Sequence, residues 1–366
     1  MIHVFVGTIA EYIKVIPLLK QLEERGVPYD LIDTGQHREL LNKLQEELKI
    51  RSPDIIVAKR HRFPSLIWGI KWILEVSLQL IFPKRWIQST VSNNTKSLGL
   101  IIGDSISTLF SLFLAKKAGL KVAYIEGGLR SYSYWHPFPE EFIRCYIPKK
   151  ADIIFAASDI AYFNLIKRTR IRNPVINMKA SLNLDTIKIS MAYSKKIPLD
   201  FGHFILVVIR RWETLVNPFK IKRLIKLILF LASQQIPVVF IVYPHMEVKL
   251  KKIKCYDALQ AHRNILVLPF MSYEKFIALL SNADCVLTDS GNIQEECYYL
   301  GIPCLVLRKC TERMMGLNKN VFIMKFNFHQ ILSFIKTLKQ RDRKVKLPGI
   351  SPSKIIIDSL KKFGYI

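Results

Sequence analysis

The chain has 366 residues, of which 50% are hydrophobic and 11% aromatic, enough to fill the cores of two domains and too apolar for a disordered chain. Lysine and arginine outnumber aspartate and glutamate by 55 to 29, giving a formal net charge of +26, which favours an anionic partner: nucleic acid, an acidic membrane face or a phosphorylated sugar. The basic residues are scattered over the whole chain with few aromatic residues between them, so we expect no nucleic-acid partner.

The cysteines and the N-terminus both indicate the cytoplasm. The six cysteines show no Cys-x-x-Cys spacing, and several lie in apolar stretches, as expected for small buried residues in a reducing compartment. The chain begins with an apolar strand and turn, without the basic segment and cleavage site of a signal peptide. The histidines lack metal-ligand spacing, so we predict neither a metal nor a cofactor.

The first elements predict an α/β unit. Residues 3–6 form an apolar strand, residues 7–11 a turn, and apolar residues then recur at helical spacing up to residue 22. We expect the turn at the carboxyl edge of a parallel sheet, where ligands bind. A second strand, residues 29–33, ends shortly before His37, which either donates to a phosphate or sugar hydroxyl or is a surface residue without a role.

An apolar stretch at residues 65–82 has two interpretations. It lies between the basic segments 59–62 and 84–86, and Lys71, Glu75 and Gln79 interrupt it about once per turn on one side. These interruptions make it a marginal membrane span. It is either a core helix of the first domain or an interfacial helix through which residues 59–86 contact the inner face of a membrane.

Further strands bring acidic residues to the same predicted sheet edge. Strand 100–102 is followed by Asp104, which is either a ligand contact or a helix N-cap, and strand 122–125 is followed by Glu126. Pro139 is expected to be the first residue of a helix, with Glu140 and Glu141 in its first turn. Carboxylates that converge raise one another's proton affinity, which suits acid-base catalysis. Residues 153–156 are expected to form the last strand of this domain.

The second half repeats the alternation of strands and helices. Strands are predicted at residues 204–209, 238–242, 265–268, 285–287, 304–307 and 322–324, and helices at 273–280, 331–336 and 352–362. We predict an α/β fold of two doubly wound, parallel-sheet, Rossmann-like domains. The predicted domains are residues 1–190 and 200–350, joined by a polar linker at 194–200, and residues 351–366 form a helix that packs back on the first domain.

The strand that ends at residue 287 leads into the strongest local motif. Asp289, Ser290 and Gly291 precede a helix, whose unpaired backbone N–H groups and positive dipole end can hold a pyrophosphate. Ser290 and Gly291, with Asn292 in the same motif, are therefore candidate phosphate contacts, and Glu296 is near enough to accept hydrogen bonds from ribose hydroxyls. The alternative is an ordinary N-cap and turn.

These motifs together resemble a known family. Residues 103–104, 126–130, 139–141, 289–297 and 311–313, in this order, resemble the non-hydrolysing UDP-N-acetylglucosamine 2-epimerases, a family with the GT-B fold. From the residues and this resemblance we predict catalytic roles for Asp104, Glu126, Glu140, Glu141, Arg210 and His245. The predicted substrate contacts are Glu11, Lys14, His37, Arg130, Arg144, Arg211, Glu213, Phe276, Ser290, Gly291, Asn292, Glu296 and Arg313.

The chain departs from the family pattern at several positions. Ile9 and Ala10 stand where the family has an arginine that contacts the nucleotide and a proline. Arg210 stands where the family has a catalytic histidine. An arginine clamps a phosphate but cannot shuttle a proton, so His245 is the candidate to replace the missing histidine.

The resemblance implies a UDP-sugar epimerase of surface-polysaccharide synthesis, acting through a glycal intermediate. The nucleotide is expected mainly on the second domain, and a homodimer is possible. Two alternatives stay open: a membrane-associated GT-B glycosyltransferase that uses a nucleotide-sugar donor, and a non-catalytic regulator that binds a nucleotide sugar.

Overall fold

The computed structural model describes residues 1–36, 51–58, 66–81, 97–134, 138–193, 202–338 and 347–366. The chain divides into two compact units. The first unit consists of Met1–Thr186 and Gly349–Ile366, and the second of Ile187–Pro348. His37 and the whole predicted linker 194–200 lie outside the described residues.

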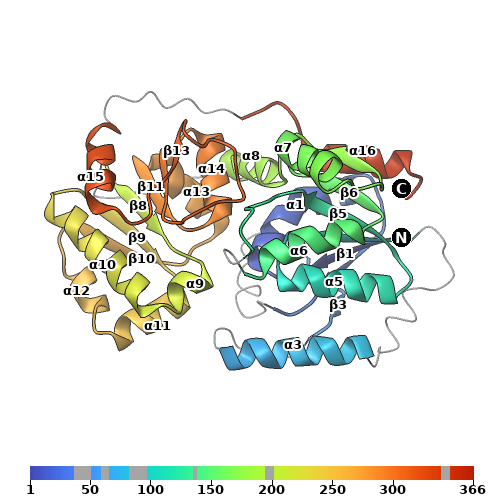
Figure 1. The fold of residues 1–366 in the computed structure, drawn as a ribbon, viewed down its shortest axis with the longest axis horizontal. Helices are drawn as coiled ribbons and strands as arrows, with labels where there is room; N and C mark the ends of the chain where they lie inside the picture. Colours follow the sequence, from blue (N-terminus) through green and yellow to red (C-terminus); the bar gives the residue numbers. More distant parts are fainter. Residues whose placement is uncertain (37–50, 59–65, 82–96, 135–137, 194–201, 339–346) are drawn as a thin grey trace. The chain divides into compact units, whose positions relative to one another are not determined.

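One parallel sheet forms the centre of the first unit (Figure 1). Its strands lie in the order β3 (Ile55–Ile56), β2 (Tyr29–Asp33), β1 (Ile2–Val6), β4 (Leu98–Ile102), β5 (Lys121–Gly127), β6 (Ile153–Ala156) and β7 (Val175–Asn177). The α-helices are α1 (Ile9–Glu24), α3 (Leu66–Ile81), α5 (Ile106–Lys117), α6 (Glu140–Tyr146), α7 (Asp159–Phe163), α8 (Asn183–Tyr193) and α16 (Pro352–Lys362). A 3-10 helix, η1 (Ile147–Lys149), follows α6, and a π-helix, η2 (Asn164–Arg168), follows α7. Helix α8 begins in the first unit and ends in the second. Helices cover both faces, so β1 and β4 are buried along their whole length.

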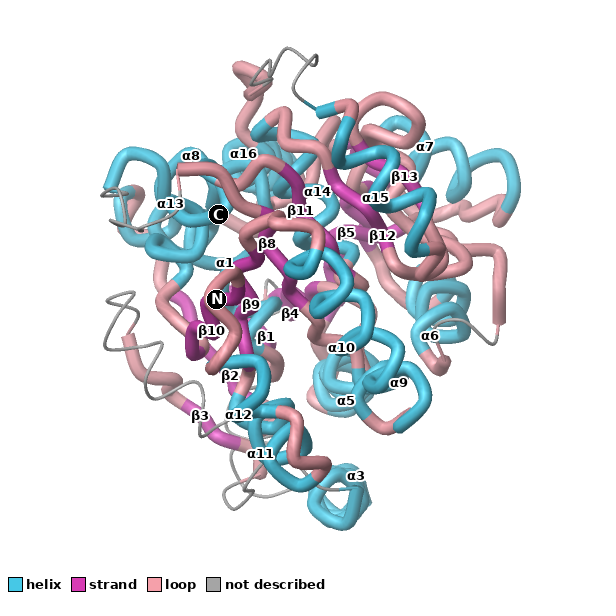
Figure 2. Tube along the Cα trace, turned by 90° about the vertical axis from the view of Figure 1, so that its left-hand side faces the viewer, coloured by secondary structure: helices cyan, strands magenta, loops and turns pink. Residues whose placement is uncertain are grey.

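A second parallel sheet forms the centre of the second unit. Its order is β10 (Ile265–Pro269), β9 (Val238–Val242), β8 (Ile205–Val208), β11 (Cys285–Thr288), β12 (Cys304–Val306) and β13 (Val321–Ile323). Its helices are α9 (Trp212–Leu215), α10 (Pro218–Ser233), α11 (Pro244–Lys252), α12 (Tyr256–Gln260), α13 (Tyr273–Asn282), α14 (Gly291–Leu300) and α15 (Phe328–Lys336). Figure 2 shows β12 and β13 side by side, and Phe322 of β13 packs on Phe334 of α15 with ring centroids 4.9 Å apart.

The prediction of an α/β fold with two doubly wound parallel sheets is confirmed. Two details were wrong. Residues 153–156 are not the last strand of the first sheet, because β7 pairs with β6 and forms its edge. Pro139 is the N-cap residue of α6 rather than its first helical residue, so α6 begins at Glu140.

The C-terminal helix α16 belongs to the first unit and contacts α1. Asp185 anchors its first turn, since the Asp185 carboxylate accepts hydrogen bonds from the backbone N and the hydroxyl of Ser353 at 2.8 and 2.6 Å. The chain thus leaves this unit after α8 has begun and returns to complete it.

Helix α3 has a buried and an exposed face. Trp72 and Val76 are buried in the core of the first unit, in agreement with the core-helix interpretation. The predicted polar stripe is not a solvent-facing stripe, because Lys71 is exposed, Glu75 half-buried and Gln79 buried. Among the described helices, none has the length and apolar character needed to cross a membrane.

Candidate active site

Glu11 holds two loops at the carboxyl edge of the first sheet. Its carboxylate accepts hydrogen bonds from the backbone N of Gly7 and Thr8 at 2.8 and 3.0 Å, which completes a capping box at the start of α1. Its other oxygen accepts hydrogen bonds from the hydroxyls of Ser105 and Thr108 at 2.6 and 3.1 Å. Burial raises the pKa of Glu11, against these hydrogen bonds. The residue therefore joins the loops that follow β1 and β4.

Lys14 and Glu126 form a buried ion pair at the same edge. The Lys14 Nζ lies 2.6 Å from Glu126 Oε2, and both side chains are almost fully buried. Glu126 has a left-handed backbone with φ of 65°, which costs about 1–2 kcal/mol for a residue other than glycine. A strained, buried carboxylate that faces a lysine is typical of functional sites rather than of ordinary cores.

Arg144 connects Asp104 with α6. Its Nε and Nη2 donate to Asp104 Oδ2 at 2.8 and 2.5 Å, and its Nη1 donates to Glu141 Oε2 at 3.2 Å. The Arg144 side chain is 2% exposed, whereas that of Asp104 is 34% exposed. Asp104 is thus the member of this cluster that solvent reaches. It is not the N-cap of α5, since Ser105 takes that position.

Glu141 and Glu140 have different surroundings although they are adjacent. Glu141 is fully buried and accepts hydrogen bonds from Arg130 Nε at 2.6 Å and from the backbone N of Ser131 at 2.9 Å. Burial alone would raise the pKa of Glu141, but the hydrogen bonds from Ser131 and Arg130 outweigh burial and hold the pKa below its usual value. Glu141 is therefore an ionised group that ties the loop after β5 to α6, whereas Glu140 is half-buried at the first position of α6.

In the second unit, Asp289 fixes the loop that carries the two arginines. The carboxylate is fully buried and accepts hydrogen bonds from the backbone N of Arg210 at 2.9 Å and of Arg211 at 3.3 Å. This joins the carboxyl ends of β8 and β11. Ser290 follows as the N-cap residue of α14, and its side chain makes no capping hydrogen bond, so it does not occupy the N–H groups of the first turn, where anions bind.

The start of α14 packs closely against the carboxylate of Glu312. A Cβ atom at Gly291 would lie 2.3 Å from Glu312 Oε1. The Glu312 carboxylate also pairs with Arg211 Nη2 at 3.3 Å and with Arg308 Nη2 at 2.9 Å. These contacts gather positive charge beside the first turn of α14. Asn292 is half-buried in that turn, and Glu213 pairs with Arg211 at 3.5 Å.

Arg313 is held inside the second unit. Its Nη1 lies 2.9 Å from Glu295 Oε2, and both residues are buried. Gln294 fixes the backbone of this segment, with its Nε2 donating to the Arg313 carbonyl at 2.5 Å. Arg313 thus connects the segment after β12 with α14.

Glu296 has a partner that the sequence did not reveal. The Tyr273 hydroxyl donates to Glu296 Oε1 at 3.0 Å, and both residues are buried. Burial first, and then the Glu296 charge, raise the pKa of Tyr273 well above its usual value. Phe276, one turn along α13, lies with its ring centroid 6.3 Å from that of Tyr273. The only sequence signal for Tyr273 is its position three residues before Phe276.

Arg210 and His245 meet at a group of aromatic residues. The Arg210 guanidinium lies 5.3 Å from the ring centroid of Tyr243, which packs against His245 at 5.9 Å and Phe270 at 5.0 Å. Burial, together with the charges of Arg210 and Lys249, lowers the pKa of His245 to about 4. His245 is therefore neutral at pH 7, and its buried Nε2 makes no hydrogen bond within the described structure.

The predicted residues thus form separate groups. The first unit brings together Lys14 with Glu126, and Asp104 with Arg144, Glu141 and Arg130. The second unit brings together Arg210 with His245, and the start of α14 with Arg211. Across the described residues, no three histidine, cysteine, aspartate or glutamate side chains are placed to hold a metal ion.

Sequence comparison finds relatives along almost the whole chain. The family model described as UDP-N-acetylglucosamine 2-epimerase matches residues 20–350. A UDP-N-acetylglucosamine 2-epimerase from Methanocaldococcus jannaschii is 26% identical over 361 residues, covering 95% of this chain and 94% of the relative. One from Campylobacter jejuni is 29% identical over 326 residues, covering 84% of this chain and 81% of the relative.

Solved structures share the fold. The crystal structure of the Methanocaldococcus jannaschii UDP-GlcNAc 2-epimerase, in complex with UDP-GlcNAc and UDP, matches with a TM-score of 0.83 at 23% identity and covers 99% of each chain. The Neisseria meningitidis enzyme bound to UDP-GlcNAc matches with a TM-score of 0.77 at 23% identity, again over 99% of each chain. Together with the family model, which spans most of the sequence, these matches lead to one conclusion: the chain belongs to the UDP-N-acetylglucosamine 2-epimerase family.

Proposed function

We propose that this protein interconverts UDP-N-acetylglucosamine and UDP-N-acetylmannosamine, its epimer at carbon 2. Family membership and relatives of this name support the activity. In the structure, the main support for the proposal is the arrangement of residues where the ends of β8 and β11 meet the start of α14. There, buried Asp289 fixes the loop of Arg210 and Arg211, and the side chain of Ser290 leaves the first N–H groups of α14 uncapped.

The second unit supplies the nucleotide contacts in this proposal. The N–H groups at the start of α14 and the charges of Arg210 and Arg211 bind the diphosphate. Glu296, oriented by Tyr273, accepts hydrogen bonds from the ribose hydroxyls, and Phe276 packs on the base. Arg313, paired with Glu295, positions this segment of the site.

The first unit supplies the acids and bases. A base removes the proton at carbon 2 while the bond from carbon 1 to UDP breaks, which gives a glycal and UDP. Re-addition of UDP at carbon 1 and of a proton to the opposite face at carbon 2 gives the epimer. Asp104, Glu126 and Glu140 are the candidate groups for these proton transfers. Glu11 and Glu141 position loops, because donors of the protein surround their carboxylates.

Arg210 differs from the histidine that the family has at this position, because arginine keeps its positive charge at every physiological pH. Arg210 therefore stabilises the negative charge on the departing diphosphate. His245 is neutral at pH 7 because its pKa is lowered to about 4. It can therefore accept or donate one hydrogen bond without adding charge.

Deuterium exchange tests this function. Purified protein is incubated with UDP-N-acetylglucosamine in deuterated water, and the sugar is analysed for deuterium at carbon 2 and for the manno epimer. We expect both, and we expect Asp104→Asn to abolish them while Asp358→Asn, an exposed carboxylate change on α16, leaves the rate unchanged. UDP release that requires an added acceptor would instead indicate a glycosyltransferase. Binding without either reaction would indicate a regulator.

A further inference from the structure

A groove of about 800 Å³ lies on the second unit, between α10 and the segment that joins β13 to α15. Arg223 and Lys226 line it from α10, and residues 323–330 line it from the other side. None of these residues belongs to the groups that we assign to the diphosphate, the ribose or the base. The groove is therefore a second candidate site within the same unit.

Contacts between its two sides hold the groove in shape. The Arg223 Nη2 donates to the carbonyl of Phe326 at 3.1 Å. The rings of Phe230 and Phe328 pack with centroids 5.7 Å apart, which joins α10 to α15. The walls are thus fixed by packing and by a hydrogen bond within the protein itself.

The backbone of the groove is strained between β13 and α15. Lys325 and Phe326 are consecutive left-handed residues, with φ of 43° and 57°. Neither is glycine, so side-chain sterics oppose both conformations. Strained residues cluster at ligand-binding sites, and both of these lie in the wall of the groove.

The charged side chains that line the groove are all positive. They are Arg223, Lys226 and Lys325, each exposed to solvent, and no aspartate or glutamate is among the lining residues. In the described part of the chain, no carboxylate forms an ion pair with these three residues. His329 adds a ring nitrogen that can donate a hydrogen bond. Three like charges around one groove repel one another, so an anion between them is favoured.

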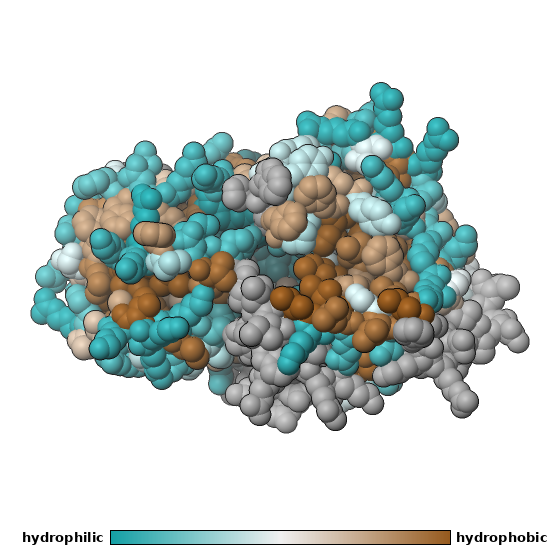
Figure 3. Space-filling view, turned by 60° about the horizontal axis from the view of Figure 1, so that its bottom comes forward, coloured by the Kyte–Doolittle hydropathy of each residue, from teal (hydrophilic) through white to brown (hydrophobic). Residues whose placement is uncertain are grey.

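Size and lining favour an organic phosphate over a free ion. Arginine and lysine side chains bind phosphate oxygens, and Arg223 and Lys226 are neighbours on one face of α10. The groove is as large as the pockets of small-molecule ligands, which are roughly 300–1,000 Å³. Half-buried Met324 and Phe328 form an apolar part of its wall, and Figure 3 shows hydrophobic and hydrophilic side chains mixed over the surface of the second unit. A ligand with an organic part can therefore use both kinds of contact.

We propose that this groove binds a phosphorylated small molecule. Its phosphate accepts hydrogen bonds from Arg223, Lys226 and Lys325, and its organic part packs on Met324 and Phe328. The site is independent of the epimerase reaction proposed above, because it shares no residue with the groups assigned to that reaction.

Calorimetric titration of the full-length protein tests the proposal. The protein is first saturated with UDP, and the probes are adenosine diphosphate, glucose 1-phosphate and inorganic pyrophosphate. We expect at least one of the two organic phosphates to bind more tightly than pyrophosphate, and to bind more weakly as salt increases. The double variant Arg223→Gln/Lys226→Gln should raise the Kd of that probe at least about tenfold, because two charged hydrogen-bond donors are lost.

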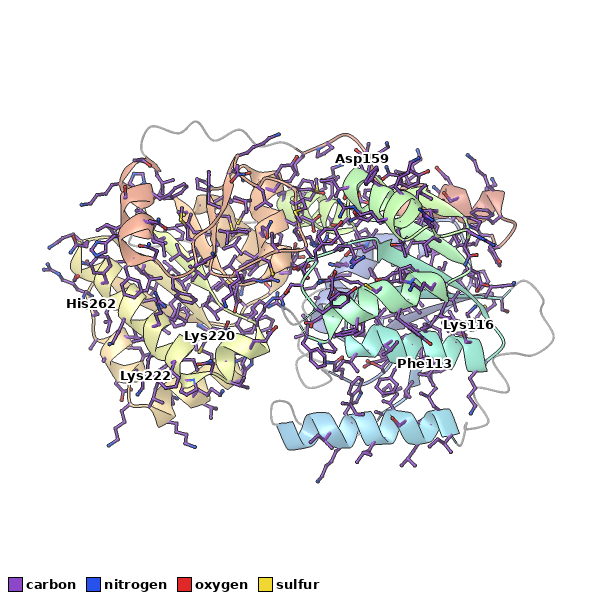
Figure 4. All side chains as sticks on the ribbon, in the orientation of Figure 1. Phe113, Lys116, Asp159, Lys220, Lys222 and His262 are labelled. Carbon is purple, nitrogen blue, oxygen red and sulfur yellow. The ribbon has the colours of Figure 1, made fainter. Side chains whose placement is uncertain are left out.

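The matched control is the double variant Lys220→Gln/Lys222→Gln. It also removes two exposed positive charges from α10 (Figure 4), but at positions that do not line the groove. It should bind the organic phosphate like the parent. Thermal melting of both double variants, followed by circular dichroism, checks that each is folded.

Three results would overturn the proposal. The first is that neither organic phosphate binds, and the second is that the two double variants weaken binding equally. The third is pyrophosphate binding as tightly as the organic phosphates, which would leave an adventitious ion only. If UDP itself does not bind, the comparison of the two double variants still isolates the groove, so a failure of the proposed epimerase function is distinguishable from a failure of this site.

Discussion

At the level of single residues, the adjacent glutamates 140 and 141 of α6 are expected to differ: Glu141 stabilises the fold and Glu140 takes part in the reaction. Glu141 is buried among donors from Arg130, Ser131 and Arg144, so Glu141→Gln removes the carboxylate that pairs with Arg130 and one of the two that pair with Arg144. We expect this change to reduce the free energy of unfolding by about 3–5 kcal/mol, measured by urea denaturation. Glu140→Gln should leave the free energy of unfolding almost unchanged and reduce the rate of deuterium exchange at carbon 2. Equal losses of stability in the two variants would contradict this division of roles.

His245 makes the stability of the protein depend on pH. Its pKa is about 4 in the folded protein against about 6.5 in an unfolded chain, so the unfolded chain takes up the proton first as the pH falls. The stabilisation that neutral His245 gives the folded protein is therefore complete above about pH 6.5. It decreases as the pH falls from about 6.5 to about 4, and it is lost below about 4. We expect Tm to fall less between pH 7 and pH 5 in His245→Gln than in the parent. NMR titration of the imidazole checks the pKa directly.

Sequence reasoning found most of these residues but not their partners. The acids after β4 and β5 were predicted because each follows an apolar strand. The sequence did not show that Glu141 lies among hydrogen-bond donors or that Tyr273 donates to Glu296. Both arrangements depend on contacts between residues that are not adjacent in the chain. Short motifs encode backbone turns and helix starts, whereas long-range pairing is decided by packing.

At the scale of elements, the start of α14 depends on the absence of a side chain at position 291. A Cβ there would lie 2.3 Å from Glu312 Oε1, and moving that carboxylate would disturb its pairing with Arg211 and Arg308. We expect Gly291→Ala to cost about 1–3 kcal/mol of stability and to weaken UDP binding, measured by calorimetry. The control is Gly69→Ala on α3, where a Cβ meets no atom within 4 Å and alanine is the better helix former. An unchanged affinity for UDP in Gly291→Ala would remove the start of α14 from the proposed site.

For helix α3, the spacing of apolar and polar residues did not decide which face of the helix is buried. The polar residues at 71, 75 and 79 indicated an amphipathic helix, and the sequence left a core position and a membrane face as alternatives. In the structure Trp72 and Val76 take the core side, while the row from Ile70 to Ile81 remains exposed. A helix that is apolar on two sides gives an ambiguous pattern, because periodicity shows how residues are spaced but not which face the fold covers.

At the scale of the whole molecule, the first unit is completed by the last helix of the chain. Ile356, Ile357 and Leu360 of α16 are fully buried, and α16 contacts α1. Leu360→Ala should cost about 2–5 kcal/mol, a large part of the stability of an ordinary domain. Because the chain folds as two compact units, we expect the loss to fall on the first unit.

Hydrogen exchange resolved by peptide measures where that loss falls. In Leu360→Ala, amides of β1 and β4 should lose protection while those of β8 and β11 keep it. The matched control is Lys361→Ala, which changes the exposed neighbouring position of the same helix and should leave both sheets protected. Equal loss of protection in both sheets would mean that the two units unfold as one cooperative structure. Selective loss would mean that α16, although it follows the second unit in sequence, stabilises only the unit to which it returns.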